Sequence, residues 1–146
     1  MSIGLKVGNG SSVTSRYSPD IKCGSGLYDF SVDGGAIGTY IIGTIPDNAT
    51  IIRARYEVLT TCTDGDDDSA TIAISTSKAA NEIVTATAIS GGSNIWDAGY
   101  HDTTCSGAAA NFTTKTTAVT NVQIVVAVAA LTAGKIRVWW EYIVSE

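Results

Sequence analysis

The amino-acid sequence predicts an all-β protein: a single antiparallel β-sandwich of the jelly-roll type, preceded by an extended N-terminal arm. Three observations carry this prediction. Apolar and polar residues alternate with a period of two in several segments, which is the pattern of strands buried on one face. Clusters of Gly, Pro, Asn and Asp separate these segments, with no regular alternation of strands and helices. The length of 146 residues fits one domain and suits a jelly roll of eight strands.

Residues 1–26 form the predicted arm, and residues 27–146 form the predicted sandwich. Glycine and serine interrupt the arm at residues 8–12 and 24–26, so neither a strand period nor a helix period persists there. A segment of this kind is disordered alone and becomes ordered on a neighbouring protein. We therefore expect the arm to contact a partner.

The first half of the sandwich contains three predicted strands. In the first, Tyr28, Phe30 and Val32 alternate with polar residues and share one face. The second spans residues 37–45 and ends at a Pro-Asp-Asn turn. The third spans Thr50–Thr61, where the alternation is clearest. Its inward face is expected to carry Ile52, Ala54, Tyr56 and Val58, and its outward face Arg53, Arg55 and Glu57.

The middle of the chain is less regular. Residues 64–68 (DGDDD) form a predicted hairpin loop, and Thr71–Ser75 follows as a strand. Lys78–Ile89 has apolar residues at helical spacing, whereas its Thr and Val content favours a strand; we predict a short helix. Residues 91–107 then form a long predicted loop.

Two long predicted strands, Val122–Val128 and Ile136–Val144, end the chain. Adjacent residues in a strand face opposite sides, so one residue of the pair Trp139–Trp140 must lie outside the sandwich's own core. We expect Trp140 to be the core residue and Trp139 to cover an interface. The other outward residues of this strand are Arg137, Glu141 and Ile143.

The composition excludes several classes of partner. The chain has 9 Lys and Arg against 14 Asp and Glu, a net charge of −5, so we expect no nucleic-acid binding. The longest apolar run, Ile124–Leu131, is far shorter than the roughly 20 residues of a membrane helix. No signal peptide is evident, which predicts synthesis in the cytoplasm with free thiols. Charged residues make up only 16% of the chain, which indicates that a partner covers part of the surface.

No catalytic, cofactor or metal site is predicted. A calcium loop of the EF-hand type that began at Asp64 would require Gly and Glu where this chain has Ser69 and Ser75, so a solvated turn is the better interpretation of residues 64–68. His101 and Asp102 are adjacent and face opposite sides of a strand, and no G-x-S-x-G motif is present. The cysteines Cys23, Cys62 and Cys105 are too widely spaced for a zinc knuckle.

Two groups of residues are predicted to make contacts. Contacts with a partner protein or with further copies of this chain are expected from the arm and from the outward face of the last strand: Leu5, Val7, Arg16, Tyr17, Arg137, Trp139 and Glu141. A possible ligand loop contains Trp96, Tyr100 and His101, whose aromatic rings are of the kind that stacks on sugars.

Four segments carry a resemblance to a known family: Tyr28–Tyr40 (YDFSVDGGAIGTY), Ile45–Ile52 (IPDNATII), Ile95–Gly99 (IWDAG) and Leu131–Ile136 (LTAGKI). With them, residues 27–145 resemble small virion proteins of tailed bacteriophages. The resemblance implies a non-enzymatic jelly-roll decoration (cement) protein on the exterior of an assembled capsid, whose partners are the major capsid protein and further copies of itself in a dimer or trimer. The alternative is a head-fibre or tail-associated jelly roll, or a free carbohydrate-binding module, that binds host glycans through the 91–107 loop.

Overall fold

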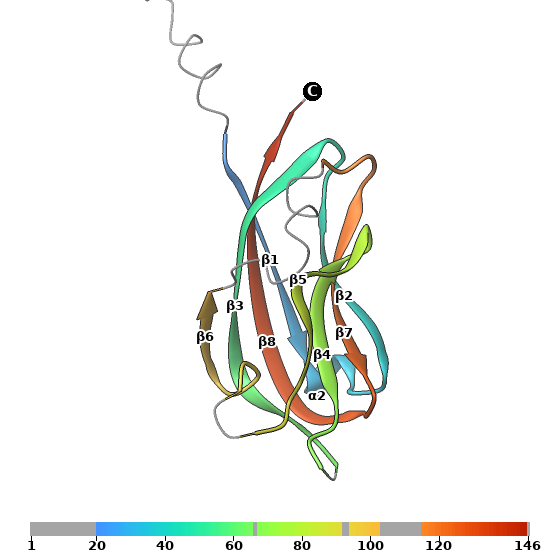
Figure 1. Cartoon of the computed structure of the whole chain (residues 1–146). Coiled ribbons are helices and arrows are strands. Elements are labelled where there is room, and N and C mark those ends of the chain that lie inside the picture. Colours follow the sequence, from blue (N-terminus) through green and yellow to red (C-terminus); the bar gives the residue numbers. More distant parts are fainter. Residues whose placement is uncertain (1–19, 66, 92–93, 103–114, 146) are drawn as a thin grey trace, which may run out of the picture.

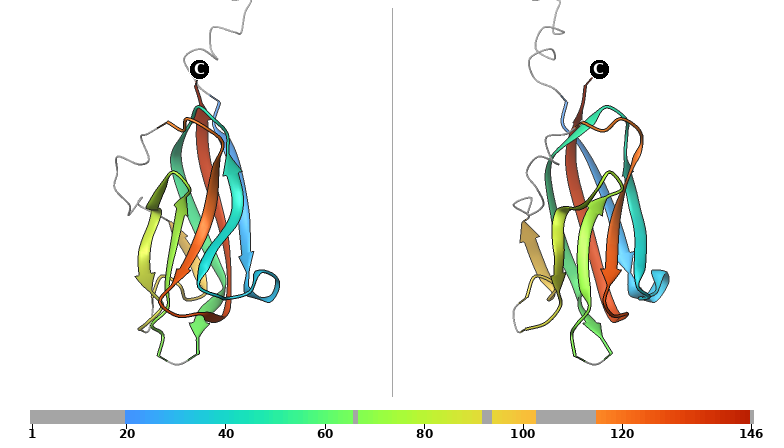
Figure 2. Two further views of the ribbon diagram at one scale, coloured as in Figure 1. Left: turned by 90° about the vertical axis from the view of Figure 1, so that its right-hand side faces the viewer. Right: turned by 45° about the vertical axis from the view of Figure 1, so that its right-hand side comes forward.

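The computed structural model describes residues 20–65, 67–91, 94–102 and 115–145, with residues 79–82 described by their backbone (Figure 1). The described part consists of eight strands and one short helical turn, arranged as two antiparallel sheets packed face to face (Figure 2). The elements are β1 (Lys22–Asp29), α2 (Phe30–Asp33), β2 (Gly38–Ile45), β3 (Ala49–Asp64), β4 (Thr71–Thr76), β5 (Ala79–Ala88), β6 (Gly99–Asp102), β7 (Thr120–Ala127) and β8 (Leu131–Val144).

The strand order identifies the topology. One sheet has the order β1-β8-β3-β6 and the other β2-β7-β4-β5. The first strand therefore pairs with the last, the second with the seventh, the third with the sixth and the fourth with the fifth. This is a long hairpin rolled up on itself, which is the jelly roll. The predicted fold class, an antiparallel all-β sandwich, is confirmed.

The core lies between the two sheets and is built by period-two alternation. On β7 and β8 buried residues alternate with partly exposed ones over most of each strand. Burying these apolar side chains is the main driving force for the fold. The largest fully buried side chains are Trp96, Trp140, Tyr28, Ile45, Ile72, Ile74, Ile83, Ile124 and Ile136.

The boundary of the predicted arm at residue 26 needs correction, because β1 begins at Lys22 and pairs with β8 without a register shift. Gly24 and Gly26 lie inside the strand and make room for neighbours. A Cβ on Gly24 would lie 2.3 Å from Trp140 Nε1, and one on Gly26 would lie 2.2 Å from the carbonyl oxygen of Ile42. These glycines therefore allow close packing inside the strand, whereas their residue type had predicted a break in strand structure.

The strand predicted through Val32 ends earlier than the alternation indicated. The Asp29 carboxylate accepts a hydrogen bond from the Ser31 backbone N–H at 2.9 Å, which caps the helical turn α2. Tyr28 is fully buried, whereas Val32 is 81% exposed. The expectation that the two share one face is wrong, because a local side-chain cap replaces the strand conformation.

The inward face of β3 is confirmed for Ala54, Tyr56 and Val58, which are buried, and is wrong for Ile52. The pairing of β3 with β8 shifts register between Ile51 and Arg53. The bulge turns Ile51 inward in place of Ile52, which is 42% exposed.

The short helix predicted over Lys78–Ile89 is also wrong, because this segment forms β5 and pairs with β4. Register shifts in that pairing allow the neighbours Ile83 and Val84 both to be buried, which mimics helical spacing in the sequence. Within the loop predicted for residues 91–107, Gly99–Asp102 forms the short strand β6 beside β3.

Candidate functional site

The outer face of the β1-β8-β3-β6 sheet gathers the outward residues of three strands. Pairing of β8 with β3 places Trp139 opposite Arg55, and Glu141 opposite Arg53. Pairing of β3 with β6 places Tyr100 opposite Glu57. Directly opposed residues project from the same face of a sheet, so these side chains form one continuous surface.

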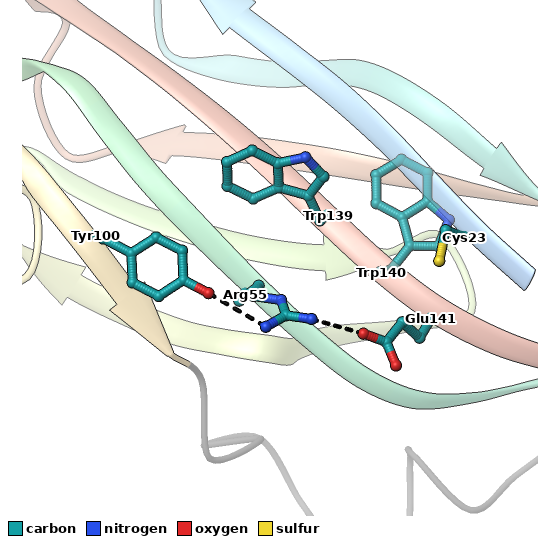
Figure 3. Close-up of a pocket in the computed structure, with 6 residues that line it drawn as sticks. All are labelled: Cys23, Arg55, Tyr100, Trp139, Trp140 and Glu141. Carbon is teal, nitrogen blue, oxygen red and sulfur yellow. Dashed lines mark hydrogen bonds and ion pairs between the residues drawn. The ribbon is translucent and has the colours of Figure 1, made fainter. Parts of the chain in front are cut away.

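This surface contains an open groove with a volume of about 310 Å³ (Figure 3). The residues that line it come from every strand of the β1-β8-β3-β6 sheet. They are Cys23 on β1, Arg55 on β3, Tyr100 on β6, and Trp139, Trp140 and Glu141 on β8.

Arg55 holds the polar part of the groove together. Its Nη2 donates to Glu141 Oε2 at 2.7 Å, and its Nη1 donates to the Tyr100 hydroxyl at 3.3 Å. These interactions, with Tyr100 first and Glu141 second, raise the pKa of the Arg55 guanidinium. A planar group bonded at both ends has little freedom to rotate, so it presents its remaining donors in a fixed geometry.

Aromatic rings form the apolar part of the groove. The ring centroids of Tyr100 and Trp139 are 6.4 Å apart, at an interplanar angle of 40°. Trp140 reaches the groove from the core side, and its Nε1 is a buried donor without a partner among the described residues. The exposed thiol of Cys23 lies at the same end of the groove (Figure 3).

A second ion pair flanks the groove on the same face. Arg53 Nη2 lies 3.4 Å from Asp102 Oδ2, and the two side chains are 48% and 57% exposed. Because both partners remain largely in water, the pair contributes little to stability, roughly 0–1 kcal/mol. It does keep this part of the face strongly hydrated.

The predicted ligand loop is corrected by the position of Trp96, which is fully buried. Its Nε1 donates to the carbonyl of Thr87 at 3.0 Å, and its ring lies 5.4 Å from that of Tyr56. The Asn94 side chain organises the turn: it donates to the carbonyls of Ile89 and Gly91, and its oxygen accepts from the Trp96 N–H. The turn therefore directs Trp96 into the core and away from any ligand.

The three predicted loop residues are separated by the fold. Tyr100 is 56% exposed and lines the groove. His101 faces the other side of β6, where its ring stacks on Tyr56 at 5.0 Å. Asp102 bonds to Arg53, so it does not orient the neighbouring imidazole. No His-Asp dyad forms from this pair.

The predicted contact residues have different outcomes. Trp139 and Glu141 lie in the groove, and Arg137 is exposed beside it on the same strand. Leu5, Val7, Arg16 and Tyr17 lie outside the described residues. Sequence reasoning missed Arg55 and Cys23 as groove residues. The alternation of β3 did indicate that Arg55 faces outward. Its contacts with Tyr100 and Glu141 depend on the pairing of β3 with β6 and β8, which the sequence pattern does not reveal.

Other chemistry-bearing residues in the described ranges are structural. Burial raises the pKa of the Cys62 thiol to about 12, which suppresses the reactive thiolate. No three His, Cys, Asp or Glu side chains gather as potential metal ligands in the part of the chain that the structure describes. Among those same residues, no helix has the length and apolarity needed to cross a membrane.

Comparison with known proteins shows a shared fold. No family model matches the sequence, and no curated protein matches it. A chain in the capsid asymmetric unit of cyanophage Pam1 is similar, with a TM-score of 0.64 and 17% identity over 87% of this chain and 86% of that one. A chain in the capsid of Ralstonia phage GP4 gives a TM-score of 0.60 and 16% identity, with the same coverage of 87% and 86%. A chain in the acid-stable capsid of Helicobacter pylori bacteriophage KHP30 gives 0.51 and 13%, over 86% and 89%. At these identities the likeness defines the class of fold, a jelly roll of the kind found in these capsid structures.

Proposed function

We propose that this chain is a non-enzymatic structural protein of a bacteriophage virion that decorates and cements the outside of an assembled capsid. The observation that carries the proposal is the jelly roll itself, which resembles chains found in three phage capsid structures over 86–87% of this chain. The residue pattern of the virion-protein resemblance points the same way. The partners that we propose are the major capsid protein and further copies of this chain, as a homodimer or homotrimer.

The region before β1 is the proposed attachment segment. Its proposed contact residues are the apolar Leu5 and Val7 and the pair Arg16–Tyr17, and in the sequence it precedes β1, an edge strand of the sandwich. Arg and Tyr are enriched among residues that dominate binding energy at protein interfaces. Arg137 on the outer face of β8 is proposed as a further contact.

The proposal is tested by mixing the purified full-length protein with empty heads of the phage that encodes it. We expect the protein to co-sediment with the heads and to raise their melting temperature, because a ligand of the assembled state stabilises that state by mass action. The double variant Arg16→Glu, Tyr17→Ala should lose most of this binding. The control Thr39→Ala, at an exposed position on β2, should bind normally.

Light scattering on the free protein tests self-association. A discrete dimer or trimer supports that part of the proposal. A monomer at all concentrations, together with heads that bind no protein and do not melt at a higher temperature, would refute the decoration role.

A further inference from the structure

We propose that the groove formed by Arg55, Tyr100, Trp139 and Glu141 binds a neutral sugar ring, such as the terminal residue of a glycan. This binding function goes beyond capsid attachment and does not require it. It also differs from the ligand loop predicted from the sequence, because Trp96 takes no part in it.

The aromatic walls supply the first half of the fit. The ring centroids of Trp139 and Tyr100 lie 6.4 Å apart at an interplanar angle of 40°, and both rings line the groove. The apolar C–H face of a sugar ring packs on such rings, while its hydroxyls remain at the edge. The volume of about 310 Å³ is at the small end of ligand sites, which are roughly 300–1,000 Å³, and suits one or two sugar rings.

Unused hydrogen-bonding capacity supplies the second half. The Arg55 guanidinium has five N–H donors. Its bonds to Tyr100 and Glu141 use one N–H on Nη1 and one on Nη2, so further N–H donors remain for a ligand. The bond from Arg55 uses Glu141 Oε2, which leaves Oε1 as an acceptor. The Tyr100 oxygen accepts from Arg55, so its own O–H is directed elsewhere. Donors and acceptors therefore alternate beside the rings, as the hydroxyls of a sugar require.

The charge of the groove selects a neutral ligand. Arg55 and Glu141 neutralise each other at 2.7 Å. A phosphate or carboxylate ligand would be attracted by Arg55 and repelled by Glu141, and a cationic ligand would meet the reverse. A polyhydroxylated neutral ring can bond to both groups without separating them.

The surroundings favour a small ligand over a protein partner on this face. Covering the face with a protein would remove water from the exposed Arg53–Asp102 pair, which is costly unless new partners replace that water. Other large apolar side chains of the described residues are more exposed than any in the groove, and they lie outside this face: beside α2, in the β7–β8 turn, before β7 and on β2 of the other sheet (Figure 2). They include Val32 at 81%, Val119 at 68%, Val128 at 67% and Ile41 at 62%.

The test is a titration of the full-length protein with the methyl glycosides of glucose, galactose, mannose and N-acetylglucosamine. Tryptophan emission and saturation-transfer NMR are the two readouts. Trp96 is buried outside the groove and Trp140 reaches it only from the core side, so a ligand in the groove should change the tryptophan emission mainly through Trp139. We expect at least one glycoside to give a saturable response, and glucose 6-phosphate to bind no more tightly than the glucoside.

Matched variants locate the binding. Trp139→Ala should weaken the glycoside response by about tenfold or more. Arg55→Lys keeps the charge but removes the planar donor geometry, so it should also weaken binding. Leu27→Ala, on the same face and outside the groove, should leave binding unchanged. Thermal melting of each variant verifies that it is folded.

Three results would overturn the proposal: none of the four glycosides binds, Trp139→Ala binds as the parent does, or the phosphorylated sugar binds best. If no glycoside binds and Trp139→Ala fails to bind phage heads, the face is a protein contact, as the sequence first indicated. Failure of capsid attachment is distinguishable, because the Arg16→Glu, Tyr17→Ala variant should still bind the glycoside.

Discussion

The two sheets of the sandwich are built from different kinds of residue. The β2-β7-β4-β5 sheet, which we call the neutral sheet, has one charged residue in its strands, Glu82 on β5. Its exposed side chains include Thr39 and Ile41 on β2. Among the described side chains, the β1-β8-β3-β6 sheet, which we call the charged sheet, carries the ion pairs Arg53–Asp102, Arg55–Glu141 and Lys135–Asp29. With 16% charged residues in the whole chain, this concentration on one sheet marks it as the sheet with specific polar contacts.

The aromatic residues follow the same division. Among the described strands, the charged sheet holds Trp139, Trp140 and most of the tyrosines, whereas Tyr40 is the aromatic residue of the other sheet. The neutral sheet is thus stabilised by its backbone ladder and by aliphatic packing. The difference indicates that the neutral sheet contributes mainly to the core, whereas the charged sheet contributes to the core and also forms the outer surface that contains the groove.

Trp96→Ala should have the largest effect, because Trp96 joins the two sheets through the Tyr56 ring on β3 and the Thr87 carbonyl on β5. Removing a fully buried indole should lower the free energy of unfolding by about 3–5 kcal/mol. Urea denaturation measures the change. Tyr100→Ala, at a 56% exposed position, should change stability far less, and equal losses for the two variants would contradict the buried position of Trp96.

Gly24→Ala tests the close packing of the charged sheet. The new Cβ would lie 2.3 Å from Trp140 Nε1, so the indole or β1 must move. Overpacking of this kind costs about 1–3 kcal/mol. Gly38→Ala on the neutral sheet is the matched control, since nothing lies within 4 Å of its new Cβ. It should be neutral or slightly stabilising, because alanine restricts the unfolded chain. Similar melting temperatures for the two variants would contradict the close contact between Gly24 and the Trp140 indole.

Arg55→Met tests whether charge supports the first sheet. The side chains of Arg55 and Glu141 are 31% and 23% exposed, so loss of this ion pair should destabilise the fold slightly and should reduce the dependence of stability on salt. Gln123→Met on the neutral sheet removes a hydrogen bond to Ser75 and should leave the salt dependence unchanged. Denaturation at low and high NaCl compares the two. An unchanged salt dependence in Arg55→Met would show that the ion pair contributes nothing.

Asp29→Asn should have the smallest effect, and its sign depends on pH. Hydrogen bonds from Lys135 first, and then from Ser31, hold the pKa of the Asp29 carboxyl at about 2, below its ordinary range. A carboxyl with a lowered folded-state pKa stabilises the fold above its unfolded pKa, and that stabilisation is lost as the pH falls towards the folded value.

The melting temperatures of the parent and Asp29→Asn should therefore differ most near neutral pH and converge between about pH 4 and pH 2. Lys135→Met supplies the control, because the Asp29 pKa should then return towards its ordinary range. A difference between parent and Asp29→Asn that is constant over this pH range would contradict the assigned interaction.

Much of the fold could be predicted because strand burial is a local pattern. The alternation in β3, β7 and β8 marks inward and outward residues without knowledge of the partner strand. The errors occurred where a second local signal intervened. Bulges moved Ile52 outward and placed Ile83 and Val84 together in the core, and the Asp29 cap ended β1.

The groove could be predicted only in part. Trp139 and Glu141 were identified as outward residues of one strand, and Tyr100 was noted in a loop. Arg55 unites them through partners that are 45 and 86 positions away in the sequence. No spacing rule connects residues so distant, and Trp96 was misplaced because the Asn94 turn reverses the direction of its side chain.

By itself, the sequence determined that the protein is an antiparallel sandwich, which side chains of its regular strands face the core, and that its charges are few. These properties follow from period-two burial and from composition, both of which are local or additive. Only the tertiary structure decided the pairing of first strand with last, the burial of Trp96 and the assembly of the groove. Each of these depends on hydrogen bonding and packing between strands far apart in the chain, where the energy of the whole arrangement selects the register.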